Sequence, residues 1–117
     1  MIVDQRTYAA RPGRLQEFVD TFTARGLPLY TRYCGTLIGY FTSESGALNQ
    51  VVHLWGYADA ADRDIRRAAL ARDPGWQVFL DMALPLLVSQ ESRLLRPTAF
   101  SPSIALPAGQ VGREWSS

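Results

Sequence analysis

The order of the elements predicted along the chain is β-α-β-β-α-α-β, which indicates an α+β fold. Two observations carry this prediction. Alternation of period two marks four strand segments, and apolar residues at helical spacing mark the stretches between them. The order matches the split β-α-β arrangement of a ferredoxin-like fold, in which a four-stranded antiparallel sheet carries helices on one face. With 117 residues, the chain has the usual length of one domain.

The pattern places all regular elements before residue 96. The predicted strands are residues 2–8, 33–42, 49–57 and 86–95. The predicted helices are residues 13–25, 60–72 and 74–84. Residues 1–96 are therefore expected to form the domain, and the proline-punctuated residues 97–117 an extended C-terminal arm or tail. Part of this arm is expected to dock, because it carries the apolar side chains of Phe100, Ile104, Leu106 and Trp115.

The first strand is too polar to be an ordinary core element. Asp4, Arg6 and Tyr8 share one of its faces, since successive side chains of a strand alternate. In the helix that follows, Gly26 predicts the end and Pro28 argues against continuation.

The second and third strands are expected to form an antiparallel hairpin, because turn residues separate them. Gly35 and Gly39 in the second strand predict a bulge or the close approach of a large group.

The third strand, residues 49–57, holds the only histidine of the chain. One of its faces carries Val51, His53, Trp55 and Tyr57, and the other carries Val52 and Leu54. Because both faces are largely apolar, both need a cover. Helices would cover one face, and the same face of a second copy is the simplest cover for the other. The sequence therefore predicts a homodimer in which two sheets pack together.

The helix after the third strand begins at the N-cap Asp59 and is expected to bury Ala61, Ile65, Ala68 and Ala69. Its other surface carries Arg63, Arg66 and Arg67, which are expected to form a solvated face, with an acidic ligand as the alternative. The next helix starts at Asp73 and Pro74 and presents Trp76 and Phe79 on its inner face.

Composition sets further bounds. A formal net charge of +1 gives no indication of a nucleic-acid partner, and all twelve basic residues are arginine. One cysteine excludes an internal disulfide and a multi-cysteine metal site, and a single reduced thiol fits a cytoplasmic protein. Neither a signal peptide nor a stretch long enough to span a membrane is expected.

Several stretches together resemble the NIPSNAP family. They are Asp4-Gln5-Arg6-Thr7-Tyr8, Gly35 to Phe41, Asn49 to Trp55, Ala61-Asp62-Arg63, Asp73-Pro74-Gly75-Trp76 and Leu94-Leu95-Arg96-Pro97. The resemblance covers about residues 1–102 through the order and spacing of these stretches. It implies a dimeric α+β barrel of ferredoxin-like subunits. Relatives with this barrel include cofactor-free monooxygenases, haem-binding decolorising peroxidases and small-molecule-degrading enzymes.

His53 and Arg6 are the candidate catalytic residues. The ordinary pKa of histidine lies near neutrality, which suits a general acid or base, although a hydrogen-bonded core or interface histidine is the commoner case. Arg6 offers a planar donor fork for an anionic or carbonyl group, with a cross-strand ion pair to Asp4 or Glu91 as the alternative.

An aromatic pocket between sheet and helices is the candidate ligand site. The expected ligand-binding residues are Tyr8, Tyr40, Trp55, Trp76 and Arg67, and core packing is the alternative for the aromatic ones. No metal site is predicted, because one histidine and one cysteine cannot supply a zinc ligand set and no carboxylate pair has a ligand spacing. No cofactor is predicted either, since haem with His53 as axial ligand has no other support in the sequence.

The functional prediction is a small-molecule-binding protein. It extends to a cofactor-independent enzyme that acts on an aromatic or polyketide-like metabolite with His53 as proton shuttle. The alternative is a non-catalytic dimeric binding or interaction module.

Overall fold

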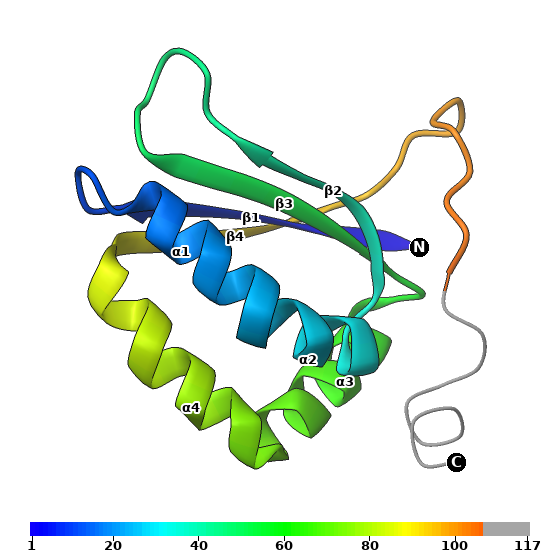
Figure 1. Ribbon diagram of the computed structural model, residues 1–117. Helices are drawn as coiled ribbons and strands as arrows, with labels where there is room; N and C mark the ends of the chain where they lie inside the picture. Colours follow the sequence, from blue (N-terminus) through cyan, green and yellow to red (C-terminus); the bar gives the residue numbers. More distant parts are fainter. Residues whose placement is uncertain (107–117) are drawn as a thin grey trace.

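Four antiparallel strands form one sheet, and all helices cover the same face of it (Figure 1). The structure, a computed structural model, describes residues 1–106 of the chain. The strands follow the order β2-β3-β1-β4 across the sheet. Their bounds are β1 Ile2–Ala10, β2 Thr36–Thr42, β3 Gln50–Tyr57 and β4 Leu87–Leu95. The predicted α+β, ferredoxin-like fold is therefore confirmed.

The helical layer consists of two long segments that connect the strands. Its elements are α1 Leu15–Thr21, η1 Phe22–Gly26, α2 Leu27–Tyr33, α3 Ala60–Arg72, α4 Pro74–Ala83 and η2 Leu84–Leu86. Both predicted caps are present, because the side chain of Asp59 accepts from the amide of Asp62 and that of Asp73 from the amide of Gly75. No helix among residues 1–106 has the length and apolar character needed to cross a membrane.

The strand register sets which side chains face the helices. Arg6 of β1 lies opposite His53 of β3, and Asp4 lies opposite Trp55. Opposed residues point to the same face of the sheet, and His53, Trp55 and Asp4 are all fully buried there. The two faces predicted for the third strand are thus confirmed, and His53 lies on the helix side rather than on the outer face.

The first helix does not end at Gly26, so that prediction is wrong. A π-helical turn at Phe22–Gly26 leads directly into α2, with Pro28 in its first turn. Proline is tolerated there because the first-turn amides of a helix need no partner inside it. Gly26 also has a packing role, since a Cβ atom would approach the rings of Phe22 and Phe79 to 2.7 and 2.8 Å. The continuation brings Tyr30 and Tyr33, expected before or at the start of a strand, into a helix.

Of the two glycines predicted inside the second strand, Gly39 lies in β2, whereas Gly35 comes directly before it. The pairing of β2 with β3 shifts register between Leu37 and Gly39, which marks an irregularity of the bulge type. A Cβ atom on Gly35 would collide with the carbonyl oxygen of Gly56, so the backbone approach there requires glycine.

Helix α3 buries a different face from the one expected. Its buried residues are Asp62, Arg66 and Leu70, whereas Ile65 is 55% exposed. The expected burial of Ala61, Ile65, Ala68 and Ala69 is therefore wrong, because only Ala69 is partly buried. The physical reason is that acidic side chains pair with the arginines beneath the helix. Arg66 donates to Asp62 at 2.9 Å, and Arg63 donates to the buried Asp4 at 2.9 Å.

The outer face of the sheet carries an apolar hollow. Its volume is about 420 Å³, and it lies between the sheet and the segment after β4. The lining residues are Val3, Ile38, Leu54, Leu95, Arg96, Pro97, Thr98, Ser101, Pro102 and Ile104. Ile104 lines this hollow, whereas Phe100 is 89% exposed. The expectation for Trp115 lies outside the described residues.

Candidate functional site

A small cavity lies between the sheet and the helices. Its volume is about 70 Å³. The polar side chains in its lining are Arg6, Tyr8, Tyr30, Arg67 and Gln90. The apolar side chains are Phe18, Phe22, Trp76, Phe79, Leu80, Ala83, Leu84 and Leu87. Four of the predicted site residues (Arg6, Tyr8, Arg67 and Trp76) therefore come together at one cavity.

The Arg6 guanidinium links the cavity to the strand below it. Its Nε donates to the hydroxyl of Tyr8 at 2.7 Å, and its NH1 donates to the Asp4 carboxylate at 3.2 Å. The pairing with Asp4 that was the alternative role of Arg6 is thus present, and Arg6 also lines the cavity. Glu91 pairs with Arg93 instead, at 4.0 Å.

Arg67 reaches the cavity from helix α3. Its NH1 donates to the Tyr30 hydroxyl at 3.3 Å, and its guanidinium lies 5.7 Å from the centre of the Tyr30 ring. Among residues 1–106, no carboxylate lies within ion-pair distance of Arg67. A partly buried guanidinium without a counter-charge favours an anion beside it.

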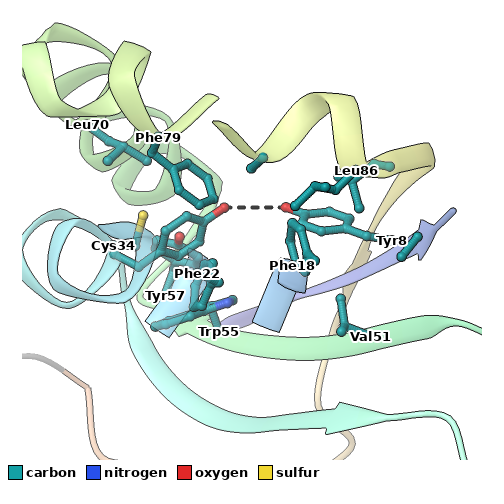
Figure 2. Close-up of a cluster of buried hydrophobic side chains, with 14 residues drawn as sticks. Tyr8, Phe18, Phe22, Cys34, Val51, Trp55, Tyr57, Leu70, Phe79 and Leu86 are labelled. Carbon is teal, nitrogen blue, oxygen red and sulfur yellow. Dashed lines mark hydrogen bonds between the residues drawn. The ribbon is translucent and has the colours of Figure 1, made fainter. Parts of the chain in front are cut away.

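The two cavity phenols face one another. The hydroxyls of Tyr8 and Tyr30 lie 3.5 Å apart, as the dashed line in Figure 2 marks. Tyr8 also packs edge-on against Phe18, with ring centres 5.9 Å apart. Burial and the neighbouring Tyr30 raise the pKa of Tyr8 well above its ordinary value, so the Tyr8 hydroxyl is a neutral O–H donor at neutral pH.

Asp4 anchors this group of side chains. It is fully buried and accepts hydrogen bonds from Ser92 at 2.7 Å, Arg63 at 2.9 Å and Arg6 at 3.2 Å. Burial alone would raise the pKa of Asp4, but the hydrogen bond from Ser92 and the positive charges of Arg6 and Arg63 outweigh it and lower the pKa. Asp4 is therefore ionised, and its negative charge is already paired with Arg6 and Arg63.

His53 lies next to the cavity but not in its lining. Its Nδ1 accepts from the indole Nε1 of Trp55 at 2.7 Å, which assigns the imidazole proton to Nε2. Among the described residues, Nε2 has no hydrogen-bond partner. Burial, reinforced by the charge of Arg6, lowers the pKa of His53 to about 3, so the imidazole is neutral at pH 7.

The remaining predicted residues pack around His53. Tyr40 stacks on the imidazole with ring centres 4.4 Å apart. Trp55 is fully buried and packs against Tyr30, with ring centres 4.9 Å apart. Neither lines the cavity. Their packing positions His53, and their roles as ligand contacts stay predictions.

Sequence reasoning missed Tyr30, which is central to the cavity. The helix-end signals Gly26 and Pro28 predict a connection at this position. Phe18, Phe22, Gly26 and Tyr30 follow a four-residue spacing, and this spacing was the available signal that one helical face continues past Gly26.

The residues around the cavity supply donors and positive charge. No group of three or more His, Cys, Asp or Glu side chains within residues 1–106 is arranged to hold a metal ion. The arrangement can bind an oxygen anion or polarise a carbonyl group. No carboxylate or imidazole lines the cavity to act as a base directly.

Residues 3–102, which include every residue of the cavity lining, match the family model described as NIPSNAP. The chain belongs to the NIPSNAP family. Among curated relatives, this NIPSNAP chain is 34% identical to Protein NipSnap of Drosophila melanogaster over 102 residues, which are 87% of this chain and 37% of that protein. It is 36% identical to Protein NipSnap homolog 2 of Mus musculus over 86% of this chain and 35% of that protein. The chain thus spans little more than a third of the length of these two relatives.

Solved structures agree with this assignment. An uncharacterized NIPSNAP-like domain protein from Burkholderia xenovorans is 44% identical, with a TM-score of 0.85 over 89% of this chain and 90% of that one. An antibiotic biosynthesis monooxygenase is 7% identical to this NIPSNAP chain, with a TM-score of 0.59. The superposition covers 84% of this chain and 99% of the monooxygenase chain. The second likeness shows a shared fold and nothing further.

Proposed function

We propose that this NIPSNAP chain binds a small molecule with an anionic or carbonyl oxygen in the cavity between sheet and helices. The observation that carries the proposal is Arg67, a cation in the cavity wall with no carboxylate partner among residues 1–106. Arg6 extends the positive lining from the opposite element. Ligand sites typically combine an apolar wall with a few convergent polar groups, and this cavity has that composition.

Removing the Arg67 charge is expected to remove ligand stabilisation. A thermal-shift screen of small metabolites should raise the melting temperature of the wild type with a subset of organic anions, because binding to the native state stabilises it. Arg67→Gln should lose at least tenfold in affinity for the same compounds, since a charge-assisted hydrogen bond contributes roughly 1.5–3 kcal/mol. Arg14→Gln, which removes an exposed arginine, is the matched control. Equal shifts in wild type and Arg67→Gln would contradict the proposal.

The proposed unit is a homodimer that buries the outer face of the sheet. Phe41 lies on this face opposite Val52 and is 57% exposed in the single chain. Exposed apolar side chains beside an apolar hollow favour a protein partner over water, and the same face of a second copy offers a self-complementary cover.

A charge placed on the outer face should separate the dimer. Phe41→Glu is expected to give a monomer by light scattering at micromolar concentration, because a buried unpaired carboxylate is costly. Leu48→Glu serves as the control, since Leu48 is 71% exposed outside the strands. A wild-type monomer, or a Phe41→Glu dimer, would refute the proposed arrangement.

Catalysis without a cofactor is an extension of this proposal. Haem does not fit, because His53 is fully buried under Tyr40 and the cavity holds only about 70 Å³. The ring centres of His53 and the cavity-lining Tyr8 lie 4.8 Å apart. A proton passing between His53 and a ligand would therefore have to cross the layer of side chains that includes Tyr8. This role requires that the wild type turns over a bound compound, and that His53→Asn still binds this compound but no longer turns it over. Without turnover, the chain is a binding module.

A further inference from the structure

We propose that the hydroxyls of Tyr8 and Tyr30 form a paired donor site for one oxygen of a short aliphatic carboxylate. This inference rests on the proposed function and names its ligand class. It also assigns a binding role to Tyr30, on helix α2.

Counting hydrogen-bond donors shows a surplus at the phenols. Arg6 Nε already donates to the Tyr8 oxygen, and Arg67 NH1 donates to the Tyr30 oxygen. Each phenol also has one proton of its own to donate. Across the 3.5 Å contact only one hydroxyl can donate to the other, so at least one proton is left over. Apart from that mutual contact, neither hydroxyl donates a hydrogen bond within residues 1–106.

No acceptor in the cavity wall removes this surplus. Asp4, on the same strand as Tyr8, already accepts from Ser92, Arg63 and Arg6. The other polar side chains of the wall are two guanidiniums, which only donate, and Gln90, whose amide oxygen receives no hydrogen bond from either phenol within residues 1–106. A ligand that complements this wall must supply acceptor atoms and negative charge.

The size of the cavity limits the ligand. An apolar cavity of about 150 Å³ holds benzene. The present cavity, at about 70 Å³, is roughly half of that, so it admits a chain of about two to four carbons. Phe79, Leu80 and Ala83 of helix α4 provide an apolar wall for that chain. This size favours a smaller ligand than the aromatic or polyketide-like metabolite expected from the sequence.

The inference is tested by calorimetric titration of the full chain with propionate, propionamide and benzoate. Propionamide has nearly the same shape as propionate without the charge, and benzoate adds an aromatic ring. We expect propionate to bind at least tenfold more tightly than either. The Tyr8→Phe/Tyr30→Phe double variant should lose at least tenfold in affinity for propionate, because the two hydroxyl donors are removed while the rings and both guanidiniums remain.

Tyr33→Phe is the matched control, since the Tyr33 hydroxyl donates to Asp73 away from the cavity lining. It should bind propionate as the wild type does. The single Tyr8→Phe and Tyr30→Phe variants replace the double variant if thermal unfolding shows that it does not fold.

The outcomes separate this inference from the proposed function. If the phenylalanine variants bind propionate within threefold of wild type while Arg67→Gln does not, the cavity binds anions without the phenols and the inference is wrong. Propionamide or benzoate binding as tightly as propionate would overturn the inference too. So would a thermal-shift screen in which no short aliphatic carboxylate binds, while other anions bind in a manner that Arg67→Gln abolishes. If no compound of either experiment binds, the proposed function fails with it.

Discussion

Replacing Asp4 by asparagine is expected to lower the free energy of unfolding by about 3–5 kcal/mol. Asp4 is fully buried and is the shared carboxylate for Arg6 and Arg63. Asparagine keeps the shape but removes the charge, so Arg6 loses its counter-charge and Arg63 keeps only its pair with the exposed Asp64. Breaking a buried ion pair on one side is costly because the remaining charge stays desolvated. Denaturant unfolding at pH 7 measures the loss.

Glu91→Gln is the control for Asp4→Asn. Glu91 lies on the neighbouring strand β4, and its ion pair with Arg93 is exposed on both sides. Exposed pairs contribute little, so the change should stay within about 0.5 kcal/mol. Similar small losses in both variants would show that Asp4 does not hold the site together.

Lowering the pH from 7 to 4.5 is expected to cost the native state roughly 2–3 kcal/mol through His53 alone. In the unfolded chain the imidazole takes up a proton near pH 6.5, whereas the folded-state pKa is lowered to about 3. The stabilising contribution of the neutral imidazole is therefore complete above pH 6.5. It falls by about 1.4 kcal/mol per pH unit below that value, until the folded pKa is reached.

The pH window identifies the group responsible. His53 is the only histidine of the chain. The pKa of Asp4 is 3.8 in the unfolded chain and lower in the folded one. The stabilising contribution of Asp4 is therefore lost only below pH 3.8, as the pH falls through the folded-state pKa. His53→Asn, whose side-chain oxygen can still accept from Trp55, should flatten the slope between pH 6.5 and 4.5. Val51→Ala, on the same face of β3, should lower stability at every pH and keep the slope.

Urea unfolding at several pH values provides the comparison. A wild-type stability that stays constant between pH 6.5 and 4.5 would show that folding does not lower the pKa of His53. His53 would then be a candidate for proton transfer near neutral pH, contrary to the buried, neutral group described above.

The strands were predictable because each leaves a local pattern. The two faces of β3 follow from alternation, and the order of elements restricts the sheet to few arrangements. The end of the first helix was not predictable in the same way. Gly26 and Pro28 are local stop signals, but a π-helical turn and the packing of Gly26 against Phe79 override them.

The candidate site was predicted in part, for a related reason. Arg6 and Tyr8 were identified because a polar strand face is unusual. The burial of Arg63 and Arg66 was missed because amphipathic patterns treat charge as exposed, whereas Asp4 and Asp62 supply partners beneath helix α3. Which of Arg63, Arg66 and Arg67 has no carboxylate partner among residues 1–106 depends on those pairings, and they exist only in the folded chain.

The central claim is that a small anion binds between sheet and helices at Arg67 and Arg6. Its most direct test is an NMR titration of the full chain with propionate, following the arginine Nε–H signals. We expect the signals of Arg67 and Arg6 to shift in a saturable manner, while the exposed Arg14 and Arg93 change little. Shifts confined to exposed arginines, or equal and unsaturated shifts at all of them, would contradict the claim.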